Sequence, residues 1–148
     1  MENFSISQIK ENEREQLIEL LQEANLPVSD LPERLDHFLL ARKGDSVIGS
    51  IGLEVFGPHA LLRSMVVTRG MQGEGIGKLL ISHLMTDISR RAAQIEEIYL
   101  ITENAAKFFS SAGFEAVERA TVPAVIKEVP QFKNLCPSSA TVMRYKVS

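Results

Sequence analysis

The sequence predicts an α/β (α+β) protein with one domain over residues 1–148, built on a mixed central sheet of about six or seven strands flanked by helices. Its 148 residues, 45% hydrophobic and 24% charged, are typical of one globular domain with a substantial core. Short apolar segments with strand character alternate with segments whose apolar residues recur at helical spacing. One succession of strand, helix and strand predicts a unit with parallel outer strands.

The first part of the chain predicts a short strand followed by a helix. Phe4 and Ile6 alternate with polar residues, which is typical of a strand with one buried face. Residues 12–24 place their large aliphatic side chains on one helical face, and Pro27 cannot continue that helix. The segment 28–37 contains a second proline and predicts a loop or a short helix.

Strands joined by tight turns come next. Residues 38–42 and 46–56 predict two strands connected by the turn Lys43-Gly44-Asp45. Gly57-Pro58 then turns the chain into a strand over 60–67. The remaining segments predict a helix over 75–91, a strand over 97–102, a helix over 105–112, an antiparallel strand pair at 114–118 and 140–147, and a short helical piece with a loop within 122–137.

Composition excludes several function classes. A net charge of −3 gives no overall field that favours nucleic acid or an anionic membrane. The longest apolar runs are far too short to cross a bilayer, and the acidic, polar N-terminus does not resemble a signal peptide. A single cysteine excludes an internal disulfide framework and indicates a reducing compartment. We therefore expect a cytoplasmic protein, and no spacing of histidine, cysteine and aspartate predicts a metal site.

Residues 61–78 carry the strongest functional signal. An apolar strand ending near Val67 is followed by a turn with four glycines and by the start of an amphipathic helix near Gly75. Glycine has no Cβ, so a large anion can approach the backbone closely. The first amides of a helix lack intrahelical partners and point toward such an anion, which the helix dipole also favours. We therefore expect a phosphate-bearing ligand at the start of this helix.

Two common phosphate signatures do not fit this turn. A P-loop requires a hydroxyl where Leu79 stands and a glycine where Gln72 stands. A dinucleotide fingerprint requires a third glycine where Lys78 stands. The pattern that fits is Q/R-x-x-G-x-G, which the chain carries as Gln72-Gly73-Glu74-Gly75-Ile76-Gly77.

Placed directly after a strand, that pattern resembles the pyrophosphate-binding signature of the GCN5-related N-acetyltransferases (GNAT). A second segment, 105–114, resembles the A-x-x-F-Y-x-x-x-G-F helix of the same family, and the order of elements is similar over nearly the whole chain. Locally, Leu62-Arg63-Ser64, Phe108-Phe109 and the tail 122–141 resemble the arsenic-resistance N-acetyltransferases of the ArsN type. That branch is also similar to the acetyltransferase domain of amino-acid N-acetyltransferases.

The resemblance implies that the chain uses acetyl-CoA as cosubstrate, without a metal, and transfers the acetyl group directly to a small-molecule amine. The acceptor that it favours is an amino acid or an amino-acid-like toxicant. A non-catalytic acyl-CoA-binding or sensing module and a protein N-acetyltransferase stay open as alternatives, and a homodimer is compatible with this fold. The residues that the resemblance places around the cofactor are Met65, Val66, Val67, Arg69, Gln72, Gly73, Glu74, Gly75, Ile76, Gly77, Lys78, Thr102, Ala105, Phe108 and Phe109.

Two positions depart from the family pattern. Many members carry a tyrosine where Phe109 stands, and its hydroxyl is thought to protonate the departing thiolate. Phe109 has no proton to donate, so water or another group must supply it, or the domain binds acyl-CoA without efficient turnover. Thr102 stands where an asparagine is common. Lys78 is either a charge near the pyrophosphate or a solvated helix residue.

Glu54 is our candidate for the general base. The alternation of Ile51, Leu53 and Val55 predicts an inward face, which places Glu54 on the opposite face of its strand. A carboxylate there can draw a proton from a substrate ammonium through water.

The neighbouring candidates are Arg63 and Ser64. The planar fork of Arg63 can bind a substrate carboxylate, and Ser64 can assist catalysis. A Glu54–Arg63 ion pair across neighbouring strands, with no catalytic role, is an equal alternative. Cys136 either lines the acceptor pocket or packs as a small hydrophobic residue.

Overall fold

The computed structural model describes residues 4–26, 28–134 and 140–147. They belong to two compact units, of which the first comprises Met1–Leu53 and Arg63–Arg91 and the second Glu54–Leu62 and Ala92–Ser148. Each unit has a hydrophobic cluster of its own, and a single domain over the whole chain stays a prediction. Within the described ranges, no helix combines the length and the apolar character that a membrane span requires.

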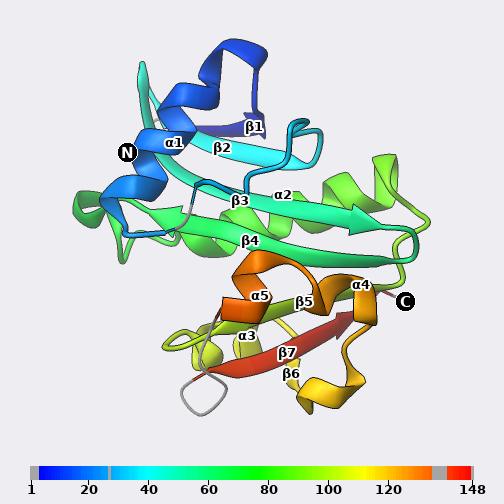
Figure 1. Cartoon of the computed structure of the whole chain (residues 1–148). Helices are drawn as coiled ribbons and strands as arrows, with labels where there is room; N and C mark the ends of the chain where they lie inside the picture. The colour runs from blue at the N-terminus through cyan, green and yellow to red at the C-terminus, as the bar shows by residue number, and fades with distance from the viewer. Residues whose placement is uncertain (1–3, 27, 135–139, 148) are drawn as a thin grey trace. The chain divides into compact units, whose positions relative to one another are not determined.

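The first unit is layered around antiparallel strands. Phe38 and Leu40 pack against Leu17 and Leu21 of the first helix, while alternation along the strand turns Leu39 to the other face. The second helix contacts the two N-terminal strands, and Figure 1 shows the two helices on opposite faces. The elements are β1 (Ser5–Gln8), η1 (Glu11–Glu13), α1 (Arg14–Glu23), β2 (Phe38–Lys43), most of β3 (Ser46–Phe56), the end of β4 (His59–Val67), η2 (Arg69–Met71) and α2 (Ile76–Arg91).

The second unit contains the start of β4 and the C-terminal strands. Its elements are β5 (Glu97–Thr102), α3 (Ala106–Ser111), β6 (Glu115–Ala116), η3 (Arg119–Thr121), α4 (Ala124–Lys127), α5 (Pro130–Asn134) and β7 (Thr141–Lys146). β4 and β5 are parallel, as the strand–helix–strand succession predicts. β7 is antiparallel to both β5 and β6, which confirms the predicted C-terminal pair. Side chains of β5 and β7 join α4 and α5 in one hydrophobic cluster.

The strands follow the order β1-β2-β3-β4-β5-β7-β6 in one seven-stranded mixed sheet, so the predicted fold class is confirmed. Two features of burial differ from what alternation and helical spacing alone would indicate. Ser50 and Gly52 are buried together with Ile51 and Leu53, because this part of β3 is covered on both faces and not on one. Leu79 has 41% of its surface exposed, although its spacing placed it with the core residues of α2.

Gly52 leaves room for the ring of Phe38, its partner on β2. A Cβ added at Gly52 would lie 2.3 Å from the nearest ring carbon, well inside contact distance. We expect Gly52→Ala to lower the free energy of unfolding by about 2 kcal/mol, because overpacking displaces a buried ring. Urea unfolding measures the effect. Gly70→Ala is the matched control, since no described atom lies within 4 Å of its built Cβ; equal stability of the two variants would contradict the prediction.

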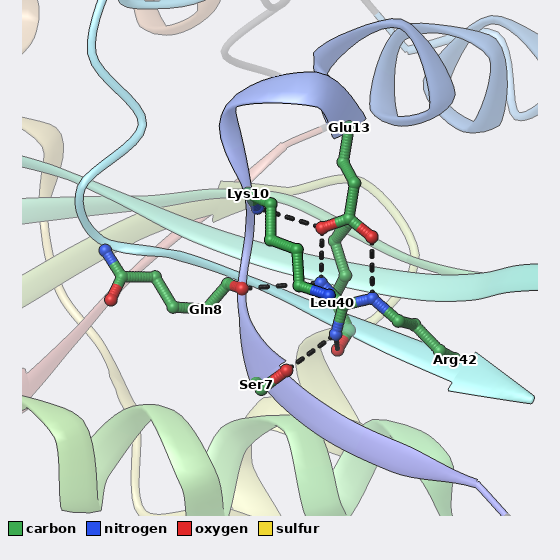
Figure 2. Close-up of polar contacts among 6 residues, drawn as sticks. All are labelled: Ser7, Gln8, Lys10, Glu13, Leu40 and Arg42. Atoms are coloured by element: carbon green, nitrogen blue, oxygen red, sulfur yellow. Dashed lines mark hydrogen bonds and ion pairs between the residues drawn. The ribbon is translucent and has the colours of Figure 1, made fainter.

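A charged network joins η1 to β2 (Figure 2). Both carboxylate oxygens of Glu13 accept hydrogen bonds from the Arg42 guanidinium, with Arg42 Nε 2.7 Å from Oε2. The backbone amide of Lys10 donates to Glu13 Oε1 at 2.8 Å, and Arg42 also donates to Ser7 Oγ at 2.7 Å. The hydrogen bonds from Arg42 outweigh the effect of burial and lower the pKa of Glu13 from 4.5 to about 2.

Candidate active site

Hydrogen bonds hold the end of β4 and the glycine turn that follows it in place. The Thr68 amide donates to the Ile48 carbonyl at 2.9 Å, which ties the end of β4 to β3. The Gln72 side chain donates from Nε2 to the Val67 carbonyl at 3.0 Å. Sequence reasoning assigned only an amide to Gln72, whereas its side chain also holds the turn against the strand.

The geometry of the turn fits a pyrophosphate group. Gly73 and Gly75 have φ values of +86° and +83°, a left-handed conformation that L side chains rarely adopt. No described atom lies within 4 Å of a Cβ built on either glycine, so the backbone faces open space. α2 begins at Ile76, and the Leu79 amide donates to the Gly75 carbonyl at 3.1 Å. The amides of the first helical turn, from Ile76 on, are therefore available to an anion.

Charged residues lie on both sides of this helix start in the sequence. Arg69 and Lys78 are exposed, one on each side of the turn, and both supply positive charge. Glu74 is also exposed, so only its backbone amide suits an anionic ligand. Ile76 is buried, and Gly77 is half-buried, so each can contribute its backbone but no polar side chain.

A groove of about 410 Å³ runs beside the end of β4. β4 and the turn contribute Val66, Val67, Thr68, Arg69 and Gln72 to it. Its other wall comes from α1 and the residue that follows it, namely Leu20, Glu23 and Ala24. Sequence reasoning missed this wall, because an amphipathic helix carries no motif that distinguishes a ligand-lining end from a core-facing one.

Ser64 interrupts the regular geometry of β4. It is buried and has φ = +56°, which is uncommon for a residue other than glycine. Its carbonyl accepts a hydrogen bond from the Ser50 hydroxyl at 2.6 Å. The irregularity lies immediately before Met65, Val66 and Val67, which are half-buried and form the predicted cofactor strand. Residues with a strained backbone conformation of this kind are often found at functional sites.

Arg63 is bound to a partner that the sequence did not reveal. Its side chain is 1% exposed and forms a bidentate ion pair with Asp30, with Nη2–Oδ1 and Nη1–Oδ2 distances of 2.8 and 3.2 Å. Arg63 Nε also donates to Ser64 Oγ at 3.2 Å. Two of the predicted site residues are therefore in contact, and Asp30 joins them from the segment 28–37.

Glu54 is half-buried in the part of β3 that belongs to the second unit, whereas Arg63 and Ser64 belong to the first. The general-base role of Glu54 and the alternative Glu54–Arg63 ion pair both stay predictions.

The end of β5, the residue before α3 and α3 itself carry the remaining predicted cofactor residues. Phe109 is buried, and its ring lies edge-on to Phe108 and Phe114, with ring centres 5.2 and 5.7 Å away. The Thr102 hydroxyl accepts a hydrogen bond from the Ala105 amide at 3.1 Å, which fixes the chain just before the helix. Phe109 thus serves as a packing residue at the position where many family members carry a hydroxyl.

His59 and His83 lie in different environments. His59 pairs with Glu97 at 3.1 Å in the second unit, and Glu97 also accepts a hydrogen bond from the Tyr99 hydroxyl. Burial raises the pKa of Tyr99 above its usual value. His83 is exposed on α2, as expected for a helix-surface residue. No group of three potential ligands occurs among the described residues, and Cys136 lies outside them.

Comparisons with known proteins identify the family. The family model described as an acetyltransferase (GNAT) domain matches residues 34–116, which is more than half of the chain. This match covers the end of the segment 28–37, the glycine turn and α3. It confirms the predicted family, the acetyltransferases of the GNAT type.

Solved structures share the fold over essentially the full chain at low sequence identity. One is an N-acetylglutamate synthase from Neisseria gonorrhoeae in complex with coenzyme A and N-acetyl-glutamate (TM-score 0.79, 16% identity, 100% of this chain and 36% of that one). This chain thus spans about a third of that protein. Others are a GNAT acetyltransferase from Staphylococcus aureus Mu50 (0.75, 22%, 99% and 100%) and the ribosomal-protein-S18-alanine N-acetyltransferase from Escherichia coli (0.73, 18%, 99% and 95%). With its family model, its sheet and its glycine turn in agreement, the chain belongs to the GNAT acetyltransferase family.

Proposed function

We propose that this chain transfers the acetyl group of acetyl-CoA directly to the amine of a small molecule. The observation that carries the proposal is the open glycine turn between β4 and α2, with two left-handed glycines and a helix start behind it. Membership of the acetyltransferase family and the coenzyme A bound to the N-acetylglutamate synthase support acetyl-CoA as cosubstrate. The amides of residues 72–77 would hold the pyrophosphate, with Arg69 and Lys78 nearby.

The chemistry requires a held thioester, a polarised carbonyl and an amine that has lost its proton. In this proposal the backbone of Met65 and Val67 pairs with the pantetheine arm, and the Val66 amide polarises the thioester carbonyl. A preorganised donor of this kind contributes on the order of 3 kcal/mol to the transition state. Glu54 takes a proton from the substrate ammonium through water, and the freed amine nitrogen then bonds to the carbonyl carbon. The carbon–sulfur bond breaks, and the nitrogen gives its second proton to water. Since Phe109 has no hydroxyl, water or another group must protonate the thiolate.

An amino acid or an amino-acid-like toxicant is the acceptor that we propose. Arg63 supports it, because a guanidinium fork binds carboxylates in a bidentate geometry, the geometry that its pair with Asp30 has. The N-acetylglutamate bound to the Neisseria enzyme is an acetylated amino acid. The Escherichia coli enzyme acts on a ribosomal protein, so a protein substrate is the competing acceptor class. The likeness to the arsenic-resistance branch, a cytoplasmic location and a homodimer also stay predictions, and residues 135–139 of the tail match are outside the described chain.

Phe109 favours a second candidate, a non-catalytic acyl-CoA-binding or sensing module. Its buried ring packs against Phe108 and Phe114, which gives the position a structural role without a proton to donate. Calorimetric titration with acetyl-CoA, followed by a free-thiol release screen across amino acids, their analogues and peptides, separates the candidates. Amine-dependent thiol release establishes the transferase, and binding without release favours the sensing module. An absence of binding would overturn the assignment of the glycine turn.

A valine at position 75 tests the turn itself. Gly75→Val is expected to raise the Kd for acetyl-CoA about tenfold, because a β-branched residue does not adopt φ near +83° and the turn must rearrange. Calorimetric titration measures the change. Gly44→Val, in the β2–β3 turn, is the matched control: it imposes similar strain at φ = +61° outside the site. An equal rise in Kd for the two variants would remove the turn from cofactor binding.

A further inference from the structure

The groove between the end of α1 and the end of β4 combines apolar walls with one carboxylate, that of Glu23. It has a volume of about 410 Å³, and all of its lining residues belong to the first unit. The apolar side chains that line it are Leu20, Ala24, Val66 and Val67. Glu23 itself is exposed, so a ligand that enters the groove from solvent can reach its carboxylate.

Glu23 stands where a negative charge is unfavourable to the helix. It is the last residue of α1, and the C-terminal end of a helix carries a partial negative charge. The last turn of α1 contains no basic residue that would offset this charge. Among the described residues, the structure gives Glu23 neither an ion pair nor a side-chain hydrogen bond. The carboxylate and the helix end therefore make this wall of the groove negative, and a bound cation would offset that charge.

The opposite wall of the groove is the strand that we propose to hold the thioester. Val66 lines the groove, and its amide is the proposed donor to the thioester carbonyl. A carboxylate at Glu23 repels the pyrophosphate of acetyl-CoA, so it does not suit the cofactor. It does suit the acceptor, whose amine is a cation before it loses its proton. A carboxylate paired with an ammonium forms hydrogen bonds that are stronger than those between neutral groups.

We propose that Glu23 binds the ammonium group of the acceptor, and that the apolar walls of the groove receive the acceptor's side chain. The inference rests on the proposed function, since it names the substrate class of that same reaction. The class is primary amines with an apolar body, which includes the apolar amino acids. Glu23 is a specificity-determining residue in this proposal, and removal of the proton stays with Glu54.

Glu23→Gln tests the site in turnover. Glutamine has nearly the same size but no charge, so we expect KM for the best apolar amino acid of the thiol-release screen to rise about tenfold, with kcat within about twofold. The Kd for acetyl-CoA should stay equal or fall, because a repulsive charge is removed. Glu19→Gln, exposed on α1 outside the groove, is the charge-matched control and should change none of these values. An unchanged KM, or a Kd for acetyl-CoA that rises together with KM, would overturn the proposal.

A binding test separates this inference from the proposed function. Leucine amide carries the ammonium, and 4-methylpentanamide is the same molecule without it. Saturation-transfer NMR at about pH 6.5, where the α-ammonium is mostly protonated, compares their affinities in the presence of coenzyme A, which has no acetyl group to transfer. We expect wild type and Glu19→Gln to bind leucine amide about tenfold more tightly than the neutral amide, and Glu23→Gln to bind the two equally.

The outcomes of the binding test have separate meanings. Equal affinities in wild type, or a preference for leucine amide that persists in Glu23→Gln, would overturn the inference even if the enzyme acetylates amines. A preference that Glu23→Gln abolishes, without turnover of any amine, would uphold the ammonium site and reject the proposed activity. Because the substitution removes an unfavourable charge from a helix end, we expect the variant to fold with a Tm no lower than that of wild type.

Discussion

Replacing Glu13 by glutamine is expected to lower the free energy of unfolding at pH 7 by about 3 kcal/mol. The reason is the interaction of its carboxylate with Arg42, which lowers the pKa of Glu13 from 4.5 to about 2 in the folded protein. Each unit of pKa difference between the folded and unfolded states corresponds to about 1.4 kcal/mol of stability. Glutamine keeps one acceptor oxygen but loses the charge that the half-buried guanidinium pairs with.

The same substitution is expected to change the acid stability. Because the pKa of Glu13 is lowered by folding, its contribution is fully present above about pH 4.5 and is lost as the pH falls toward 2. Urea unfolding from pH 7 down to pH 3 measures the difference between wild type and Glu13→Gln, which should shrink over the acidic part of that range. Glu11→Gln is the control, since Glu11 is exposed on the same turn. A stability difference that is independent of pH would contradict this account.

Glu54→Gln is expected to lower kcat/KM at neutral pH by about 10²-fold, the lower end of what a positioned general base contributes. Raising the pH should restore much of the rate, because the acceptor amine then loses its proton without help. A pH–rate profile from pH 6 to pH 10 measures both effects. Glu118→Gln, an exposed position in the second unit, should leave the profile unchanged.

The opposite outcome has an equally definite meaning. A Glu54→Gln variant with a normal pH–rate profile would remove Glu54 from proton transfer and leave the Glu54–Arg63 ion pair as the remaining interpretation of this carboxylate. If rate falls by the same factor at every pH, the variant has lost an interaction other than proton abstraction. Neither result would bear on the proposed role of the glycine turn in cofactor binding.

The fold could be predicted from local patterns, because the residues that form a strand or a helix are neighbours in the sequence. The glycine turn is such a pattern, since Gly73, Gly75 and the helix start lie within a few positions of one another. An ion pair between residues that are far apart in the sequence produces no pattern in the residues around either of them. Asp30 lies 33 residues from Arg63, and Glu13 lies 29 residues from Arg42, so no periodicity or motif connects either pair.

Where both faces of a strand are buried, the alternation of polar and apolar residues does not predict which side chains are exposed. In β3, Ser50 and Gly52 alternate with apolar residues, yet both are buried. Gly52 is small because the ring of Phe38 occupies the space above it, and the Ser50 hydroxyl is satisfied by the Ser64 carbonyl. A small or polar residue in a strand therefore indicates a close neighbour as readily as it indicates solvent.

The left-handed backbone at Ser64 has a consequence for how this position can vary. Its φ of +56° constrains the main chain, and its carbonyl, not its hydroxyl, receives the bond from Ser50. Glycine and asparagine tolerate this conformation, whereas threonine retains the hydroxyl but is β-branched and resists it. Substitutions that look conservative by side-chain chemistry would thus be the disruptive ones here. Position 64 therefore has to keep a torsion angle as well as the hydroxyl that accepts the hydrogen bond from Arg63 Nε, and a comparison of side-chain chemistry alone would overlook the torsion angle.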